Sequence, residues 1–135
     1  MTIKFMNKEH YDFYNAKVQE LNLYNDRERR ALIYVLSLTE NCRKCFKDCF
    51  EGYYIKPDAL KHPWVTSDDA RAIRFGFGLY SDDLPTVDAC SANRRLREAR
   101  RYNASDLFCC RLAPYFCEAI KIRYPEYFDL DGEDD

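Results

Sequence analysis

The longest apolar run of the chain follows a polar segment and predicts a buried helix. Residues 25–30 are polar, whereas residues 31–38 (ALIYVLSL) are almost wholly apolar. Asn25 can serve as the N-cap, with Glu28 at the spacing of a capping box. A helix that is apolar on most of its sides is one that other helices surround. We therefore expect residues 25–38 to form a central helix, flanked by the first, third and last helices.

Other segments show helix-start signals or apolar residues at helical spacing. Asn7 can cap a first helix that ends near Leu21. Thr66 opens a strong start signal, because acidic residues follow in the first turn. Pro114 suits the first turn of a last helix, and Pro125 ends that helix. The predicted helices are 7–21, 25–38, 39–52, 66–80, 87–101 and 114–124, with a short additional helix at 103–112.

These segments predict an all-α fold: a single compact helical domain of about six helices around the buried central helix. No stretch alternates as a strand does. A chain of 135 residues has the size of one domain. We assign residues 1–128 to this domain, with Tyr127 and Phe128 packed back on its body. Residues 129–135 (DLDGEDD) are expected to form an acidic C-terminal tail.

Two glycines stand inside the predicted helix that begins at Thr66. Gly76 and Gly78 each cost about 1 kcal/mol relative to alanine in a helix interior. We therefore expect either a close approach of another backbone at these glycines or an early end of the helix.

Composition and charge restrict the classes of protein. Hydrophobic residues make up 47% of the chain, which argues against disorder. The net charge of −2 creates no global field toward nucleic acid or membranes. No apolar run approaches the roughly 20 residues of a membrane span, and the N-terminus lacks a signal-peptide pattern. We expect a cytoplasmic protein whose seven cysteines are reduced thiols.

Cys42, Cys45 and Cys49 form the first candidate site. Closely spaced thiolates suit zinc and iron–sulfur clusters. The same spacing is also the ordinary period of core residues on a helix, and a free cysteine often packs as a small hydrophobic side chain. We favour core packing and expect no metal or other cofactor, but the pattern leaves both interpretations open.

The second candidate is the arginine-rich segment 93–102, which holds five arginines and one glutamate, a net charge of +4. On one continuous helix, Arg94, Arg97 and Arg101 would share a face. Such a face could bind an acidic protein surface or hold phosphates through paired guanidinium contacts. Alternatively, its charges are solvated and pair with nearby acids or with the acidic tail.

The third candidate combines Trp64 with two arginines of the following helix. Trp64, Arg71 and Arg74 could form a small pocket that stacks a base and holds an anion. In the alternative interpretation, Trp64 fills the edge of the core, and the arginines pair with Asp68 or Asp69.

Arg27, Arg29 and Arg30 lie in the first turn of the central helix, where the helix dipole disfavours positive charge. They should therefore either pair with carboxylates of the chain or lie at a binding edge.

The chain contains no complete catalytic motif. His10 and His62 are its only histidines, and neither belongs to a metal-binding motif. A glycine-rich phosphate loop and a G-x-S-x-G nucleophile elbow are both absent. We therefore expect a protein that is not an enzyme.

Four segments spread over most of the chain carry a resemblance. They are Phe5-Met6-Asn7 with His10, Asp26-Arg27-Glu28-Arg29 with Tyr34, Ile55-Lys56-Pro57 with Trp64, and Glu118-Ala119-Ile120-Lys121-Ile122-Arg123-Tyr124. Together they resemble a domain-of-unknown-function family of small helical proteins from Gram-positive gut bacteria and their mobile elements. The resemblance implies no catalytic residues. It implies an accessory protein, such as a mobile-element or phage inhibitor that binds and blocks a host defence protein.

We therefore expect a non-enzymatic protein-interaction module. The alternative is a nucleic-acid or nucleotide-binding protein that uses the arginine-rich helix and Trp64. The predicted partner-binding residues are Arg94, Arg97, Arg101, Trp64, Arg71 and Arg74.

Overall fold

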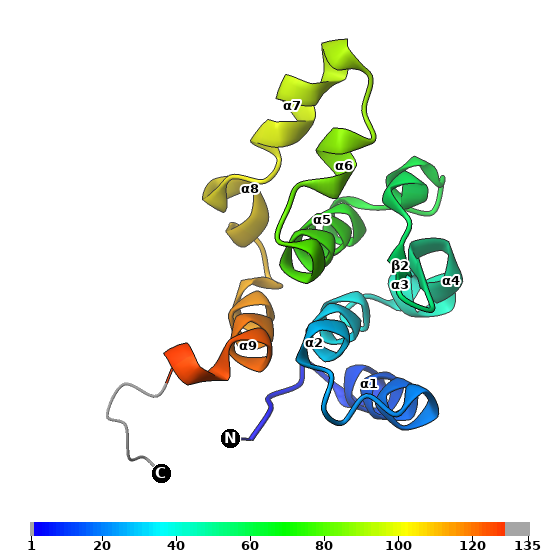
Figure 1. Ribbon diagram of the computed structural model, residues 1–135, viewed down its shortest axis with the longest axis vertical. Coiled ribbons are helices and arrows are strands. Elements are labelled where there is room, and N and C mark those ends of the chain that lie inside the picture. The colour runs from blue at the N-terminus through cyan, green and yellow to red at the C-terminus, as the bar shows by residue number, and fades with distance from the viewer. Residues whose placement is uncertain (1, 129–135) are drawn as a thin grey trace.

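The described part of the chain, residues 2–128, is arranged around α2 (Arg27–Leu36) (Figure 1). In this computed structural model, α2 packs most extensively against two later helices and also against the first helix. The prediction of a central helix is confirmed, although α5 takes the place expected for the third helix. The three helices around α2 are α5 (Ser67–Ser81), α9 (Ala113–Arg123) and α1 (Lys8–Leu21).

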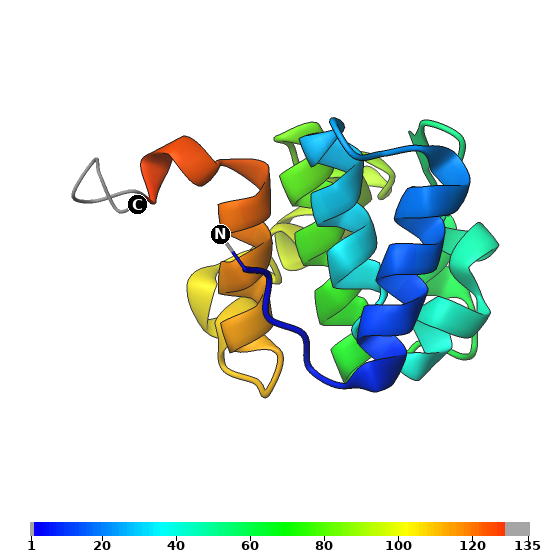
Figure 2. The ribbon, with the colours of Figure 1, turned by 90° about the horizontal axis from the view of Figure 1, so that it is seen from below.

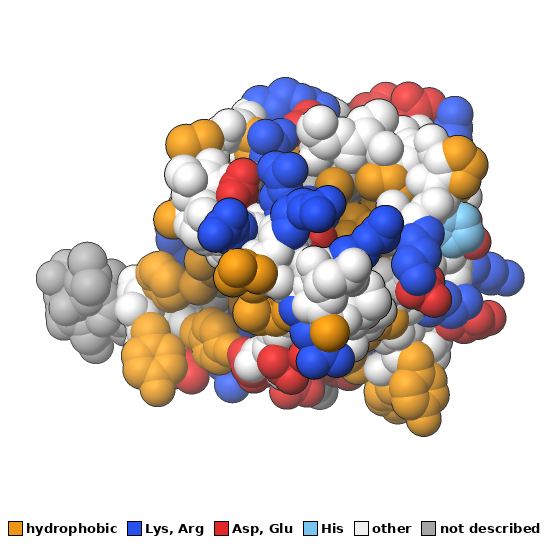
Figure 3. Space-filling model, turned by 90° about the horizontal axis from the view of Figure 1, so that it is seen from above, with side chains coloured by type: hydrophobic (Ala, Val, Ile, Leu, Met, Phe, Trp, Pro, Cys, Tyr) orange, Lys and Arg blue, Asp and Glu red, His pale blue; other side chains and the backbone are white. Residues whose placement is uncertain are grey.

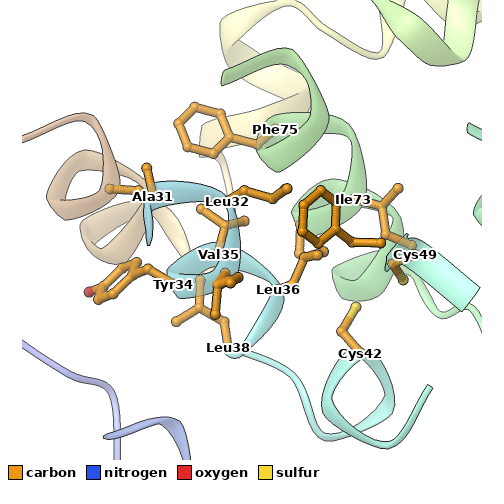
Figure 4. Packing of buried hydrophobic residues seen from close by; sticks show 14 of the residues in the cluster. Ala31, Leu32, Tyr34, Val35, Leu36, Leu38, Cys42, Cys49, Ile73 and Phe75 are labelled. Carbon is orange, nitrogen blue, oxygen red and sulfur yellow. The ribbon is translucent and has the colours of Figure 1, made fainter. Parts of the chain in front are cut away.

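The apolar run of α2 is covered on all sides. Residues 31–38 are buried, and most of them have no exposed surface. Figure 4 shows Leu32 and Val35 pointing between α2 and α5, whereas Tyr34 lies on the opposite side of α2. The expected approach of another backbone is found at Gly78, where a Cβ atom would lie 3.2 Å from the carbonyl oxygen of Asp83, but not at Gly76. A Cβ atom at Gly76 would lie 3.2 Å from Leu32 Cδ1 and 3.4 Å from Val35 Cγ1. Side chains of α2, rather than its backbone, fill this space.

The segment that precedes α1 links α2 to α9 through hydrogen bonds of Lys4. The hydroxyl of Tyr34 donates a hydrogen bond to the carbonyl of Lys4. The backbone N–H of Lys4 donates to Glu118 Oε2 at 3.0 Å. Figure 2 shows this segment running past α9 before the chain enters α1. Lys4 therefore joins the central helix to the last one.

The cap of α2 differs from the prediction. Asp26, not Asn25, is the N-cap, and its Oδ1 accepts a hydrogen bond from the Arg29 backbone N–H at 3.0 Å. The expected pairing of Asn25 with Glu28 is therefore wrong. Asp26 also binds the Arg29 side chain, with 2.8 Å between Oδ2 and Nε, and this second bond favours the later start.

The helix predicted for residues 39–52 is broken. Cys45 leaves the helical conformation, and Gly52 has a φ of +66° at the tip of a hairpin. Phe50 is buried and packs edge-on against the ring of Tyr80, which favours an extended chain over another helical turn. The strands are antiparallel, with Phe50 opposite Ile55. The resulting elements are α3 (Glu40–Lys44), α4 (Phe46–Cys49), β1 (Phe50–Glu51) and β2 (Tyr54–Ile55).

The helix predicted for residues 87–101 is also broken. Ser91 is extended, and the chain re-enters helical geometry only at Ala92. The short helix predicted through Leu112 ends earlier, because Cys109 leaves helical geometry. Asn103 caps it, accepting a hydrogen bond from the Asp106 N–H at 2.9 Å. The elements are α6 (Pro85–Asp88), the 3-10 helix η2 (Ala92–Arg94), α7 (Arg95–Arg100) and α8 (Ala104–Phe108).

Two further 3-10 helices, η1 (Pro57–Lys61) and η3 (Pro125–Tyr127), complete the described chain. Tyr127 is 74% exposed and Phe128 is 44% exposed, so the prediction that they pack back on the body is wrong. The residues assigned to the acidic tail lie outside the described part.

Residues 2–128 form nine α-helices and one small hairpin, which confirms the all-α prediction. The number exceeds six because two of the predicted long helices each divide into two and the short additional helix, α8, is also present. Among these helices, none has the length and hydrophobicity that crossing a membrane requires.

Candidate functional site

Three of the predicted binding residues meet at one hollow on the surface. Arg71 and Arg74 lie on the face of α5 that also carries Ser67, because the spacings of four and three residues match the helical turn. Arg101, which follows α7, approaches this face from the other side. The hollow has a volume of about 230 Å³ and is lined by Ser67, Ala70, Arg71, Arg74, Arg101 and Asp106.

The arginines of the hollow are held by α8 and α5. Arg71 Nε donates to the carbonyl of Asp106 at 2.9 Å, and its Nη1 reaches Asp68 at 3.4 Å. The Asp106 carboxylate lies 3.6 Å from Arg101 Nη1. Asp106 therefore places both Arg71 and Arg101, one through its backbone and the other through its side chain.

Arg74 is held by a buried polar network between α5, α6 and α7. Its Nε and Nη2 donate to the two carboxylate oxygens of Glu98, at 2.6 and 3.0 Å. Thr86, which is 3% exposed, also donates to Glu98 at 2.6 Å and lies 2.6 Å from the Tyr102 hydroxyl. Burial favours a raised pKa for Glu98, but the bonds from Arg74 and Thr86 outweigh it and lower the pKa below its ordinary value. Glu98 is thus a charged anchor for Arg74.

The remaining two arginines of the prediction, Arg94 and Arg97, do not line this hollow. Arg94 belongs to η2 and lines a second hollow of about 500 Å³, together with Arg74, Thr86 and Glu98. Arg97 is exposed on α7 and lines neither hollow. The three arginines expected to share one face thus do not line one common hollow: Arg101 lines the first, Arg94 lines the second and Arg97 lines neither.

Four arginines in and beside α7 have no carboxylate partner within residues 2–128. Arg94, Arg95, Arg97 and Arg100 are exposed, and none forms an ion pair with a carboxylate of residues 2–128. Figure 3 looks onto this end of the molecule and shows Lys and Arg side chains gathered across it. Positive charge therefore accumulates here although the whole chain carries a net negative charge.

Trp64 does not join these arginines. Its indole N–H donates to Asp48 at 3.2 Å, and its ring stacks on His62 with 5.9 Å between the ring centroids. It packs at the edge of the hydrophobic core and is not among the residues that line either hollow. The pocket expected for Trp64 with Arg71 and Arg74 does not form.

The cysteines of the first candidate belong to different surroundings. Cys42 and Cys49 are buried in the core, whereas Cys45 is half-buried at the break between α3 and α4. A hydrogen bond with the Cys42 thiol and burial both raise the pKa of Cys49, so its thiol stays protonated. In residues 2–128, no group of three or more potential ligands could hold a metal ion.

Two of the three arginines at the start of α2, Arg27 and Arg29, serve the architecture. Arg27 Nη1 lies 2.8 Å from Glu126 Oε1 of η3. Arg29 binds Asp26, donates to the carbonyl of Gly52 at 3.1 Å and lies over the ring of Tyr53. These bonds connect α2 to η3 and to the hairpin.

The profile of a family of unknown function, DUF6075, matches residues 1–134. The chain belongs to this family. The match includes the arginines around α7 and those of the hollow, so they lie within the DUF6075 domain. No curated protein and no solved structure matches the chain.

Several residues of the DUF6075 site were not predicted from the sequence. The spacing of Ser67, Arg71 and Arg74 could have revealed the face that lines the hollow. No local sequence signal could have predicted that Asp106 and Arg101 lie beside this face of α5. Their position depends on how α7 and α8 fold back against α5. The Thr86–Glu98–Tyr102 network likewise forms only after the helix predicted for residues 87–101 has broken.

Proposed function

We propose that this DUF6075 protein is a non-enzymatic interaction module that binds an acidic surface of a partner protein through α7. The four exposed arginines that lack a carboxylate partner within residues 2–128 carry this proposal. These four lie within seven consecutive residues, so their positive charge is concentrated on one short stretch of the chain. Complementary charge of this density accelerates association and selects acidic partners.

α7 also offers an apolar contact among its charges. Leu96 is 68% exposed, and none of the residues of α7 is buried in the fold. An apolar side chain surrounded by arginines suits an interface whose centre excludes water, since arginine is enriched where binding energy is concentrated. The helix is therefore open to a partner on the side away from Glu98, whose carboxylate is held by Arg74 and Thr86.

The family resemblance suggests a particular form of this function. An inhibitor from a mobile element or phage would bind and block a host defence protein, and the arginine surface would then contact acidic residues of that protein. This role is a prediction from resemblance, and it adds no residue to the proposed surface.

The test compares two variants that lose the same charge. Arg97→Gln with Arg100→Gln removes two charges of the surface, and Lys4→Gln with Lys47→Gln removes two exposed charges elsewhere. A photo-crosslinking residue at position 96 would trap the partner in extracts of the source organism. We expect the arginine variant to weaken binding of the purified partner about tenfold, roughly 0.7 kcal/mol per charge, and the lysine variant to leave it unchanged.

Two results would contradict this proposal. One is a trapped protein that binds both variants equally well, because α7 would then be irrelevant to recognition. The other is the recovery of DNA or RNA in place of protein, with an affinity that falls steeply with salt. The second result would support the nucleic-acid alternative, although without Trp64.

A further inference from the structure

We infer that the hollow lined by Arg71, Arg74 and Arg101 is a binding site for a phosphate group, in the form of a phosphomonoester dianion. The proposed interaction surface on α7 uses other arginines, so this site goes beyond it. Three guanidinium groups from two separate parts of the chain surround one concavity. Guanidinium groups match phosphate oxygens through paired, charge-assisted hydrogen bonds.

Each of these arginines keeps hydrogen-bond donors for a ligand. Arg71 uses Nε and Nη1 within the protein, and Arg74 uses Nε and Nη2. Arg71 Nη2 and Arg74 Nη1 have no hydrogen bond within residues 2–128. The only buried side-chain nitrogen or oxygen without a partner in that range is Arg30 Nε, so both of these nitrogens reach solvent.

The site is formed before a ligand arrives. The side chains of Arg71 and Arg74 are 31% and 16% exposed, and both are fixed by the bonds to Asp106 and Glu98. Side chains that are already ordered lose little conformational entropy on binding. Arg101 is 55% exposed and can close onto the ligand from outside.

The charge around the hollow is positive but modest. Asp106, Asp68 and Glu98 pair with the three arginines, and Arg111 shares Asp68 at 3.0 Å. Four arginines and three carboxylates leave a net charge of +1. The hollow also includes Ser67, the first residue of α5, where the helix dipole favours an anion.

The size of the hollow limits the ligand. A volume of about 230 Å³ is smaller than the roughly 300–1,000 Å³ of pockets that enclose whole small molecules. It can accept a phosphate group while the rest of the ligand stays outside. A phosphorylated side chain of a protein and a small phosphorylated metabolite share this chemistry.

The test is an NMR titration of the full chain with inorganic phosphate at constant ionic strength. We expect backbone amide shifts at residues 67–74 and 101–106 that saturate with a dissociation constant of about 1–10 mM. Arg101→Gln should weaken binding about tenfold, and Ala70→Glu should abolish it while every arginine remains. Arg97→Gln removes the same charge outside the hollow and should change nothing.

These measurements distinguish phosphate binding at the hollow from non-specific electrostatic attraction to the protein. No saturable shifts would overturn the inference, as would an equal loss of affinity in Arg97→Gln and Arg101→Gln. Parallel titrations with a phosphoserine peptide and with AMP identify the source of the phosphate, because the natural ligand should bind more tightly than phosphate alone. Circular dichroism of each variant shows whether its fold is intact, and Ala70→Glu keeps the test informative if Arg101→Gln unfolds.

Discussion

His10 is a fully buried side chain whose two ring nitrogens are both used. Nδ1 accepts a hydrogen bond from the Met6 N–H at 3.1 Å, so the proton lies on Nε2, which donates to the carbonyl of Tyr34 at 2.9 Å. The ring packs against those of Phe5 and Tyr34. A neutral imidazole satisfies this arrangement, whereas a protonated Nδ1 would lose its bond to Met6.

The stability of the protein should therefore depend on pH through His10. Burial lowers the pKa of His10 from 6.5 to about 4. The unfolded chain takes up the proton first as the pH falls, so the stabilisation is complete above pH 6.5 and is lost between pH 6.5 and about 4. The loss should reach about 3 kcal/mol in the free energy of unfolding, measured by urea denaturation at a series of pH values.

A pair of histidine variants isolates this effect. His10→Gln should be less stable than the wild type at neutral pH but should show little change down to pH 5. His62→Gln replaces the other histidine, which is partly exposed, and serves as the matched control. Asp69 and Glu98 have lowered pKa values, so their protonation contributes only at lower pH. If the free energy of unfolding of His10→Gln fell with pH as steeply as that of the wild type, a group other than His10 would cause the pH dependence.

A capping signal in the sequence predicts the first residue of a helix correctly where the side-chain and tertiary contacts favour the same cap. Thr66 and Asp69 form the capping box at the start of α5, as the acidic first turn suggested. At α2 two neighbouring residues could act as the cap, and the spacing alone favoured the wrong one. The bond from Arg29 to Asp26 decides between them, and it depends on side-chain geometry that the sequence pattern does not contain.

Substitution of these two neighbours should give different results. Asp26→Ala should lower the free energy of unfolding by about 1–2 kcal/mol, because the cap of the central helix is lost. Asn25→Ala should change it by less than about 0.5 kcal/mol, since Asn25 is exposed and does not cap the helix. Asp26→Ser, which keeps a capping oxygen, should recover most of the loss. If Asn25→Ala lowered the free energy of unfolding more than Asp26→Ala in thermal or urea denaturation, Asn25 would be the cap, as the sequence predicted.

Sequence periodicity was reliable for helices with a large buried face and unreliable for the others. α1, α2, α5 and α9 each bury three or more residues, and each was predicted within a few residues. α7 buries none, so no packing requires the helix to continue back through Ser91. The arginines of the site were recognised by their charge, but their grouping into one hollow depends on how α7 and α8 return to α5, which the sequence pattern does not contain.

The fold as a whole is uneven in its packing. α2 is enclosed, whereas the segment from η2 to the end of α7 contributes no buried residue to the core. Elements with few buried contacts open locally at a small cost in free energy, even when the rest of the molecule is stable.

Limited proteolysis should reveal this difference. Trypsin should cut first within residues 94–101, while Arg29 and Arg30 in α2 stay protected, because cleavage follows local opening. Mass spectrometry of the early fragments identifies the sites. Thermolysin, which cuts before large apolar residues, serves as the control and should attack first at Leu96. If the first cuts fell within α1 or α2, the prediction that α7 opens more readily than these helices would be wrong.

The connection of Lys4 to α2 and α9 has a consequence for synthesis of the chain. The hydrogen bond between Lys4 and Glu118 joins residues 114 positions apart, and α9 is the last of the helices that enclose α2. Between the translation of Leu36 and that of Arg123, a ribosome working at 5–20 residues per second needs roughly 4–17 s. During that interval the apolar surface of α2 lacks its final cover. A nascent chain that stalls before α9 therefore presents a hydrophobic helix to chaperones and to other chains.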